Sequence, residues 1–341
     1  MKALVYEGKN NIEFKEFEQP APRAGEALIR VKAAGICGTD LSILAGKHPR
    51  AKAPLIIGHE FSGNIVSINS IKDEGLIVGD RVTAEPLISC GECIACKSGF
   101  AYVCQNLKLY GIDRNGAFAQ YVTVAIDRLY KVPDSIDNQT AALIEPLAVA
   151  VHAVRLSSLK VGDSVCVLGA GPIGLLTALV LKHSGADRIL VCEREPYRIK
   201  LAEEYGFRII DVARGNTVAE IMELTSGRGA DIVFEAAGGA STFVTATQIC
   251  RVRGEVVMIA MPKDLVPCDI VSLTFKELIV KGVRVYAPYD FERAINIMSN
   301  SGIDFSKLLS SPFPLERGVE AFAKAKSGKE VMRVLIDTSA E

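Results

Sequence analysis

The feature that most constrains the fold of this 341-residue chain is Gly169-Ala-Gly171-Pro-Ile-Gly174. It follows an apolar run at 163–168, typical of a buried strand, and precedes an apolar stretch at 175–183, typical of a helix. Glycines at this spacing permit a tight turn and let a pyrophosphate approach the free N–H groups of the helix N-terminus. An acid, Glu193, lies 19 residues after Gly174, at the end of a second predicted strand. The stretch therefore predicts a dinucleotide-binding unit.

The acid also bears on which dinucleotide is bound. Glu193 is expected to accept hydrogen bonds from ribose hydroxyls and to repel a 2′-phosphate, which favours NAD over NADP. The neighbouring Arg194 could pair with that phosphate, which keeps NADP as an alternative, although a solvated surface charge is the simpler interpretation. The predicted cofactor-binding residues are Gly169, Gly171, Pro172, Ile173, Gly174, Glu193 and Arg198.

Strand and helix patterns alternate through the same region. Further strands are predicted at 188–192, 231–234 and 255–260, and helices at 196–205, 218–225 and 241–250. Alternation of this kind predicts an α/β fold with a doubly wound parallel sheet of the Rossmann type. The uncharged run 165–181 approaches the length of a membrane span, but its glycines and Pro172 divide it into a strand and a helix.

The flanking segments have a different pattern. Short β-like runs at 3–6, 12–14, 27–31, 111–124 and 129–132 predict an irregular, barrel-like β domain. Helices are expected at 141–154, 291–299 and 315–326, with a closing strand at 331–336. We therefore predict a first domain at 1–145, the dinucleotide domain at 146–285, and a return of 286–341 to the first domain.

Four cysteines lie within fifteen residues in the spacing C-x2-C-x2-C-x7-C. Four thiolates can close around one zinc ion, and such a site is structural because no position is left for substrate. A disulfide pair, unrelated buried cysteines and an iron–sulfur cluster are the alternatives. Thiolate ligands fit a reducing cytoplasm best, and the opening residues predict no secretory signal. The ligands would be Cys90, Cys93, Cys96 and Cys104.

A second metal site is predicted from residues that lie farther apart. Cys37, His59 and Glu60 fall in turn-rich segments and belong to ligand types that zinc accepts. Glu145 lies among apolar residues and needs a partner. A metal or metal-bound water could supply one, and so could backbone N–H groups at a helix N-terminus.

The overall charge and composition do not indicate a nucleic-acid or membrane partner. The net charge is −1, from 39 basic and 40 acidic residues, so no nucleic-acid-binding surface is indicated. No membrane partner is expected either. The other cysteines are interpreted as small core residues: Cys166, Cys192, Cys250 and Cys268.

Taken together, these motifs resemble those of the zinc-dependent medium-chain dehydrogenases of the alcohol dehydrogenase superfamily. The shared motifs span essentially the whole chain and occur in the family's order. They most resemble the polyol branch (sorbitol and butanediol dehydrogenases), with threonine dehydrogenases close by. The motifs are Gly35-x-Cys37-Gly38-Thr39-Asp40, Gly58-His59-Glu60, the four-cysteine loop, Glu145-Pro146-Leu-Ala and Gly169-x-Gly171-x-x-Gly174.

The resemblance implies a GroES-like catalytic domain and two zinc ions per chain. Cys37, His59 and Glu60 would hold the catalytic zinc, with Glu145 as a fourth ligand or as a partner of metal-bound water. Thr39 matches the hydroxyl that relays the substrate proton. Many relatives have a histidine where this chain has Ser42, so the outer proton path is expected to differ, for instance by running through water.

The implied activity is transfer of a hydride from a secondary alcohol of a polyol or small diol to NAD, giving a ketone. L-Threonine as substrate and a non-catalytic nucleotide-binding relative are the alternatives. A homo-oligomer, dimer or tetramer, is expected from the resemblance. Arg284 is a candidate for a pyrophosphate contact. His48 and Tyr110 are interpreted as surface loop residues, with a place in the substrate pocket as the alternative.

Overall fold

The computed structural model describes residues 1–70, 75–262 and 264–339. The chain divides into two compact units. One comprises Met1–Glu145 together with Ala287–Glu341, and the other comprises Pro146–Tyr286.

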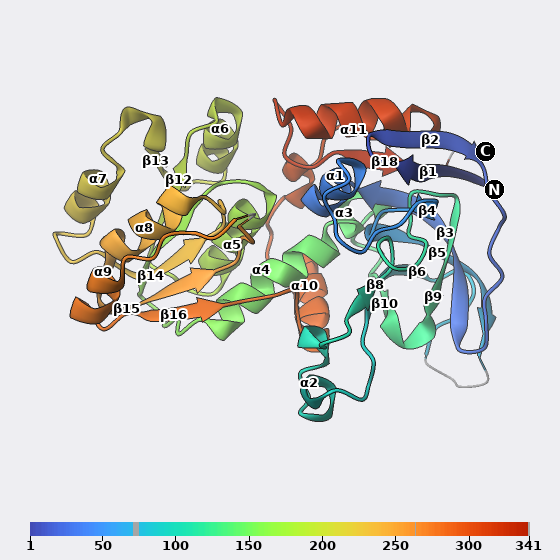
Figure 1. Ribbon diagram of the computed structural model, residues 1–341, viewed down its shortest axis with the longest axis horizontal. Coiled ribbons are helices and arrows are strands. Elements are labelled where there is room, and N and C mark those ends of the chain that lie inside the picture. Colours follow the sequence, from blue (N-terminus) through green and yellow to red (C-terminus); the bar gives the residue numbers. More distant parts are fainter. Residues whose placement is uncertain (71–74, 263, 340–341) are drawn as a thin grey trace. The chain divides into compact units, whose positions relative to one another are not determined.

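The first unit is built mainly from antiparallel strands (Figure 1). A sheet of order β10-β6-β5-β3-β18-β17 carries β9 on β3, and smaller sheets join β2-β1-β4 and β7-β8. The strands are β1 (Lys2–Gly8), β2 (Asn11–Glu16), β3 (Glu26–Gly35), β4 (Leu55–Ile56), β5 (Glu60–Asn69), β6 (Arg81–Ala84), β7 (Leu87–Ile88), β8 (Lys108–Leu109), β9 (Tyr121–Ala125), β10 (Leu129–Lys131), β17 (Phe313–Pro314) and β18 (Leu335–Asp337).

Short helices connect these strands, and the C-terminal segment returns to the same unit. Strand β18 pairs antiparallel with β3, with Leu335 opposite Gly35. Helix α11 packs along β2 and β18 (Figure 1). The helices are α1 (Gly38–Leu44), α2 (Ile94–Lys97), α3 (Asn138–Ala141), α10 (Pro288–Asn300) and α11 (Gly318–Ser327), and α4 (Ile144–Leu156) runs from this unit into the next.

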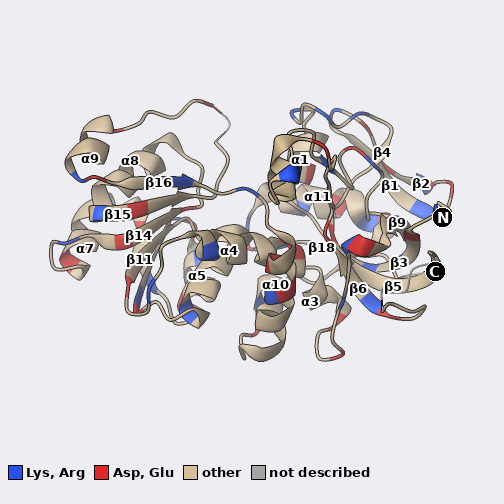
Figure 2. Cartoon of the chain, turned by 90° about the horizontal axis from the view of Figure 1, so that it is seen from below, with Lys and Arg blue, Asp and Glu red and all other residues tan. Residues whose placement is uncertain are grey.

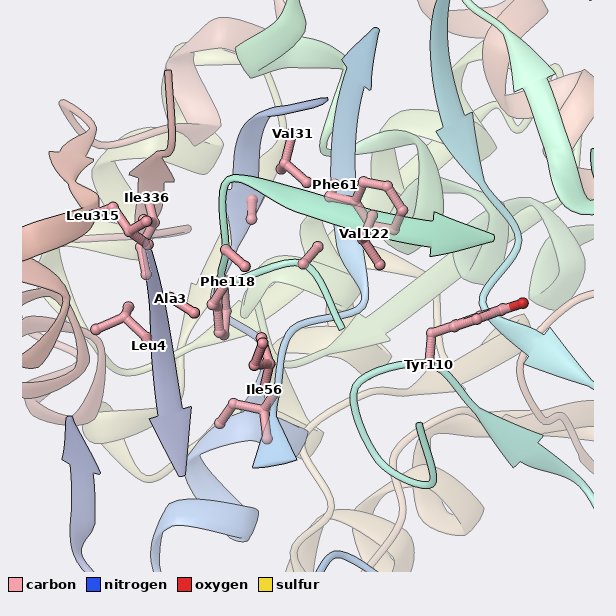
Figure 3. Close-up of a cluster of buried hydrophobic side chains, with 14 of the residues drawn as sticks. Ala3, Leu4, Val31, Ile56, Phe61, Tyr110, Phe118, Val122, Leu315 and Ile336 are labelled. Carbon is pink, nitrogen blue, oxygen red and sulfur yellow. The ribbon is translucent and has the colours of Figure 1, made fainter. Parts of the chain in front are cut away.

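The core of the first unit gathers buried side chains from segments far apart in the sequence. Leu4, Ile56 and Phe118 are all fully buried and lie together in Figure 3. The ring of Phe118 meets that of Phe322 edge to face, with centroids 5.5 Å apart. This contact fixes α11 to the sheets through an aromatic pair, a geometry that adds about 0.5–1.5 kcal/mol beyond area burial.

The second unit is a six-stranded parallel sheet of order β13-β12-β11-β14-β15-β16, with connecting helices packed against it (Figure 1). This confirms the predicted doubly wound sheet, because the order reverses between β11 and β14 as in dinucleotide-binding folds. Its elements are β11 (Ser164–Leu168), α5 (Pro172–His183), β12 (Arg188–Glu193), α6 (Pro196–Glu204), β13 (Arg208–Asp211), α7 (Thr217–Leu224), β14 (Ala230–Glu235), α8 (Ala240–Ile249), β15 (Cys250–Met258), α9 (Ile270–Phe275) and β16 (Ile279–Gly282).

Three local predictions were wrong. The segment 111–120 is not a strand but a run of turns, where Gly111 and Gly116 pack against the backbone of Gly58. The segment after Cys37 is a helix, α1, rather than a turn. Cys268 is exposed rather than buried, unlike the other three single cysteines. In the part of the chain that the structure describes, no helix is long and apolar enough to span a membrane.

Candidate functional site

A cluster of metal-ligand types forms where β3 ends and β5 begins. Cys37 caps the N-terminus of α1, and His59 and Glu60 stand at the start of β5. One potential ligand atom from each of the three lies within 4.8 Å of the others. His59 and Glu60 are buried, and Cys37 is partly exposed. Sulfur, nitrogen and carboxylate oxygen at this spacing suit a zinc ion with one side open.

Asp40 contacts two members of this cluster, a role that was not predicted from the sequence. Its Oδ2 accepts a hydrogen bond of 2.8 Å from the N–H of Cys37. Its Oδ1 lies 3.6 Å from Nδ1 of His59, and neither atom has a hydrogen-bond partner among the described residues. Two buried polar atoms without partners are costly, so this arrangement fits a site completed by a cation.

The negative charges around His59 raise the pKa of its imidazole. Burial lowers the pKa of this imidazole, but Asp40 and Cys37 more than offset burial and hold the pKa well above its ordinary value. Groups that favour a protonated imidazole also favour a metal cation at the same position. The cluster is therefore electrostatically prepared for positive charge.

Arg333 also belongs to this site and was not predicted from the sequence. Its Nη1 lies 3.0 Å from Oε2 of Glu60 and donates a 3.1 Å hydrogen bond to the carbonyl of Ile36. Burial raises the pKa of Glu60, and Arg333 acts against this rise. Burial lowers the pKa of Arg333, but Glu60, Cys37 and Glu145 raise it above its ordinary value. An arginine on a predicted closing strand offered no signal for this role.

Gly35 makes room for the carboxylate of Glu60. A Cβ at position 35 would stand 2.8 Å from Oε2 of Glu60, which is closer than real Cβ contacts allow. This explains why a glycine lies two residues before Cys37 at the end of β3.

The other two predicted catalytic residues lie at helix starts. Thr39 is the second residue of α1 and is partly buried. Glu145 is the second residue of α4 and is buried. Its charge acts on Arg333, but it is not part of the group within 4.8 Å that the described residues form.

The four cysteines of the loop converge on one point. Their Sγ–Sγ distances are 3.4 Å (Cys90–Cys104), 3.5 Å (Cys93–Cys96), 3.8 Å (Cys93–Cys104) and 4.0 Å (Cys90–Cys96). A tetrahedral ion with Zn–S bonds of about 2.3 Å places its sulfurs about 3.8 Å apart. Disulfides would need about 2.0 Å, so the geometry fits a single ion and not a pair of bridges.

Backbone N–H groups stabilise the thiolate forms of two of these cysteines. The N–H of Cys96 lowers the pKa of Cys93 to about 6, and the N–H of Glu92 lowers the pKa of Cys90. Thiolates, not thiols, are metal ligands. Cys93 also caps α2, so a four-residue helix sets two of the four sulfurs.

The glycine motif forms the turn between β11 and α5. Gly169 has φ = +95°, in the left-handed region that glycine favours. A Cβ on Gly174 would come within 1.9 Å of the carbonyl oxygen of Gly169, so only glycine lets the helix approach this closely. Pro172 begins α5 and Gly171 caps it. The free N–H groups of this helix can therefore receive a phosphate.

Glu193 stands beside this turn at the end of β12 and is buried. Its Oε2 accepts a 2.9 Å hydrogen bond from the N–H of Ala170, and its Oε1 accepts one of 2.8 Å from the N–H of Arg194. Arg198 Nη1 lies 3.9 Å from Oε2. A cavity of about 490 Å³ opens here, lined by Gly169, Gly171, Glu193, Arg194 and Arg198 among others.

One further acid, which is hydrogen-bonded to the lining residues Ala237 and Thr242, was missed. Glu235, at the end of β14, is fully buried, and its Oε1 accepts hydrogen bonds from the N–H groups of Ala237 (3.1 Å) and Gly238 (2.8 Å) and from the Thr242 hydroxyl (2.6 Å). It orders the turn that faces Gly169. The sequence contained a signal for this role: an acid, two alanines and two glycines follow the predicted strand at 231–234.

Three other residues considered for the pocket or the pyrophosphate, Tyr110, His48 and Arg284, differ in burial. Tyr110 is buried, not a surface residue, and its hydroxyl oxygen, directed away from Ile56 and Phe118 in Figure 3, accepts a 3.1 Å hydrogen bond from the N–H of Ala125. His48 is partly exposed, as expected of a loop residue. Arg284 is exposed.

Comparison with known families decides the class. Residues 23–134 match the alcohol dehydrogenase GroES-like domain, and residues 172–300 match the zinc-binding dehydrogenase domain. The chain belongs to the zinc-dependent medium-chain alcohol dehydrogenases. It is therefore an oxidoreductase, as the resemblance implied, and its fold is the GroES-like and Rossmann combination of that family.

Two curated relatives align over nearly the whole dehydrogenase. A 2-dehydro-3-deoxy-L-galactonate 5-dehydrogenase of Pseudoalteromonas atlantica is 39% identical over 342 residues, covering 100% of both chains. An L-threonine 3-dehydrogenase of Bacillus subtilis is 34% identical and covers 96% of both.

Solved structures of dehydrogenases also superpose on the whole chain. A 2R,3R-butanediol dehydrogenase from Bacillus subtilis superposes with a TM-score of 0.92 at 32% identity, covering 99% of both chains. A zinc-binding dehydrogenase from Sinorhizobium meliloti, bound to NADP, gives 0.93 at 32% and 99% of both. An alcohol dehydrogenase from Escherichia coli, complexed with NADH, gives 0.91 at 30% and 99% of both. Neighbours of this dehydrogenase thus use both nicotinamide cofactors.

Proposed function

We propose that this dehydrogenase oxidises a secondary alcohol of a polyhydroxy compound to a ketone, with a catalytic zinc and NAD. The observation that carries the proposal is the group of Cys37, His59 and Glu60, whose ligand atoms lie within 4.8 Å of one another. It supports a metal-dependent reaction over a non-catalytic nucleotide-binding role, because a purely nucleotide-binding protein has no use for such a group.

In this proposal the chain supplies the metal-binding and positioning groups. Cys37, His59 and Glu60 hold the catalytic zinc, and Asp40 orients His59. When bound, zinc acts as a Lewis acid that makes a substrate hydroxyl more acidic, and NAD accepts the hydride. Glu145 is a fourth ligand or acts on the site through Arg333. A second, structural zinc is held by Cys90, Cys93, Cys96 and Cys104.

Proton removal is assigned to Thr39. The support for this assignment is that Thr39 lies in the first turn of α1, two residues after the proposed ligand Cys37. Ser42 lies one turn later on the same helix and is partly exposed. Residues three apart on a helix share a face, so the path outward runs from Thr39 past Ser42 to solvent.

NAD is the proposed cofactor because Glu193 is ionisable and buried beside the glycine turn. Its carboxylate is anchored by the N–H groups of Ala170 and Arg194, and it stands where ribose hydroxyls would be recognised. Gly171, Pro172, Ile173 and Gly174 present the helix N-terminus to the pyrophosphate. Arg198, near Glu193, is available to the ribose or to a phosphate.

The substrate class follows from the relatives. The names of the two curated relatives place the oxidised group at carbon 5 of a sugar acid and at carbon 3 of threonine, and the butanediol enzyme acts on a diol. All three are secondary alcohols with a neighbouring polar group. We place polyols and diols first, and a sugar acid second on the strength of the 39% identity over the full chain.

A homo-oligomer is proposed from the edge of the parallel sheet. Strand β16 pairs only with β15 among the described strands, and it exposes Ile279 and Val280. Next to it, α9 exposes Ile270, Val271 and Phe275, the last at 85% of its surface. A strand with one unpaired edge, beside exposed apolar side chains, is typical of a surface that a second copy covers. A reducing cytoplasm is the proposed location, because it suits the four thiolate ligands of the cysteine loop.

The test is NADH formation from polyols, diols, sugar acids and L-threonine, with zinc content measured in parallel. Cys37→Ser should abolish turnover, lower the zinc content from two ions to one, and leave NADH binding intact. Cys268→Ser, at an exposed cysteine outside both clusters, should change none of these. Undiminished turnover in Cys37→Ser would contradict the metal assignment.

A further inference from the structure

The first unit contains a second cavity, separate from the residues proposed to bind metal. Its volume is about 680 Å³, within the range of sites for small molecules. It lies between the loop that leads into β4, the turn after β8, and strand β9. None of Cys37, His59 and Glu60 lines it.

The lining of this cavity is unusually basic for a chain whose net charge is −1. Five lining residues are basic and three are acidic, which leaves a net charge of +2. The basic residues come from separate segments: Arg23, Arg50, Lys52, Lys108 and Arg114.

Two of the three acids are already neutralised within the wall. Arg114 Nη2 lies 3.0 Å from Oε1 of Glu26, and Arg50 Nη2 lies 3.2 Å from Oδ2 of Asp113. Arg114 also stands over the ring of Tyr110, 5.4 Å from its centroid. These contacts fix the two arginines in place.

Three cations remain without a counter-ion. Arg23, Lys52 and Lys108 form no ion pair with any residue that the structure describes, and all three are exposed at the cavity. Only Glu18, also exposed, opposes them. A single exposed pair contributes about 0–1 kcal/mol, so one surface lysine would mean little. A ligand that meets three such charges at once gains from each of them.

Buried apolar side chains support the cavity. Ile56, Tyr110, Ile112 and Val122 all line it and are all at least nine-tenths buried. They leave little exposed apolar area, so the volume of about 680 Å³, which is in the range of small-molecule sites, is what favours an organic compound over a bare inorganic ion.

We propose that this cavity binds a small organic polyanion, a compound whose carboxylate or phosphate groups carry at least two negative charges on a short carbon skeleton. Its charged groups meet Arg23, Lys52 and Lys108, and its skeleton occupies the volume between them. The site is independent of the proposed oxidation chemistry, because it shares no residue with the metal cluster or with the dinucleotide cavity.

The test is isothermal titration of the zinc-loaded full chain at constant ionic strength, with saturating NADH so that the dinucleotide cavity is filled. Tricarballylate and ethyl phosphate are the probes, inorganic phosphate represents a bare ion, and acetate represents a single charge. One saturable site per chain for tricarballylate or ethyl phosphate, with weaker binding of phosphate and acetate, is expected. Which of the two probes binds more tightly distinguishes a carboxylate ligand from a phosphate ester.

Variants decide whether the binding is at this cavity. Arg23→Gln/Lys52→Gln/Lys108→Gln should weaken binding about tenfold or more, since three exposed charge contacts are lost. The matched control, Lys160→Gln/Lys329→Gln/Arg208→Gln, removes the same charge from exposed positions elsewhere and should bind as the parent does.

A variant of opposite sign completes the design. Glu18→Gln removes the one unopposed acid and should tighten binding. Equal weakening by both triple variants, or the absence of any saturable binding, would overturn the proposal. All of these positions are exposed, so loss of folding is not expected to obscure the result.

Discussion

Arg333 and Glu60 form an ion pair in the interior, with Nη1 3.0 Å from Oε2 and both side chains at most 5% exposed. The two residues come from opposite ends of the chain, and the pairing of β18 with β3 brings them together. The pair joins the closing strand to the cluster of Cys37, His59 and Glu60. The charge of Arg333 also opposes the rise in the pKa of Glu60 that burial causes.

Removing the arginine should therefore destabilise the first unit. Arg333→Met leaves Glu60 buried without its partner, which typically costs about 3–5 kcal/mol. The midpoint of thermal unfolding should fall clearly, and zinc content should drop by one ion. Arg317→Met is the control, because Arg317 and Glu320 form an exposed pair whose loss should shift the midpoint little. Similar midpoints for the two variants would show that the buried pair has no special role.

The four-cysteine loop should be structural and not catalytic. Cys93→Ser removes the thiol with the pKa of about 6 and breaks the tetrahedral set. We expect loss of one zinc ion and a lower unfolding midpoint, with NADH still bound. Cys37→Ser should also lose one ion but abolish turnover with a smaller change in the midpoint. If Cys93→Ser kept two zinc ions per chain, the loop would not be a metal site.

Cofactor choice should depend on Glu193. Glu193→Ala removes both the acceptor for ribose hydroxyls and the repulsion of a 2′-phosphate, and leaves Arg194 and Arg198 nearby. The ratio of kcat/KM for NADP to that for NAD should rise by about a hundredfold, the equivalent of two contacts of about 1.4 kcal/mol each.

Glu195→Ala provides the comparison for this change. Its side chain accepts a 3.1 Å hydrogen bond from the N–H of Arg198 at the start of α6 and does not line the cavity. Cofactor preference should stay as in the parent. An unchanged preference in Glu193→Ala as well would remove the carboxylate from the explanation of specificity.

A pH-dependent contribution to stability is expected from Glu255. This buried carboxylate on β15 lies 2.6 Å from Lys281 on β16 and accepts a 2.7 Å hydrogen bond from the N–H of Ser158. Figure 2 shows acidic and basic segments of these two strands side by side. Burial raises the pKa of Glu255, but Lys281 and Ser158 more than offset burial and lower it below its ordinary value of 4.5.

The sign follows from this lowered pKa. Below pH 4.5 the unfolded chain binds the proton more readily than the folded chain, so the stabilisation is present above that pH and is lost as the pH falls through the folded pKa. Glu255→Gln should lower the unfolding midpoint at pH 7, and the difference from the parent should shrink toward pH 3. Glu277→Gln, in an exposed pair with Arg253, should show no such dependence. A constant difference at every pH would contradict the assignment.

Some of the site could be read from local sequence because local rules fix it. The turn at Gly169 requires a positive φ, and Gly174 requires the absence of a Cβ, so glycine spacing alone indicated both. The four cysteines lie close in the chain, and their convergence needs only a short loop. Four of the six strands of the second unit were predictable for the same reason, since their apolar runs are strong, whereas β13, β16 and α9 were not predicted.

Other features escaped prediction because they depend on distant partners. The segment 111–120 was predicted as part of a β-like run, but Gly111 and Gly116 pack against the backbone of Gly58, and the segment forms turns. Tyr110 has the sequence context of a loop residue and is buried because the backbone of Ala125 provides a partner for its hydroxyl.

The sequence by itself determined the family, the ligand types and the dinucleotide turn, because each depends on residues a few positions apart or on motifs in a fixed order. The tertiary structure decided how these parts are completed. Only the antiparallel pairing of β18 with β3 brings Arg333 to Glu60. Only folding of three separate segments gathers Arg23, Lys52 and Lys108 at one cavity. Charges placed by long-range pairing leave no periodic trace in a sequence, and their effect appears only when burial removes the water between them.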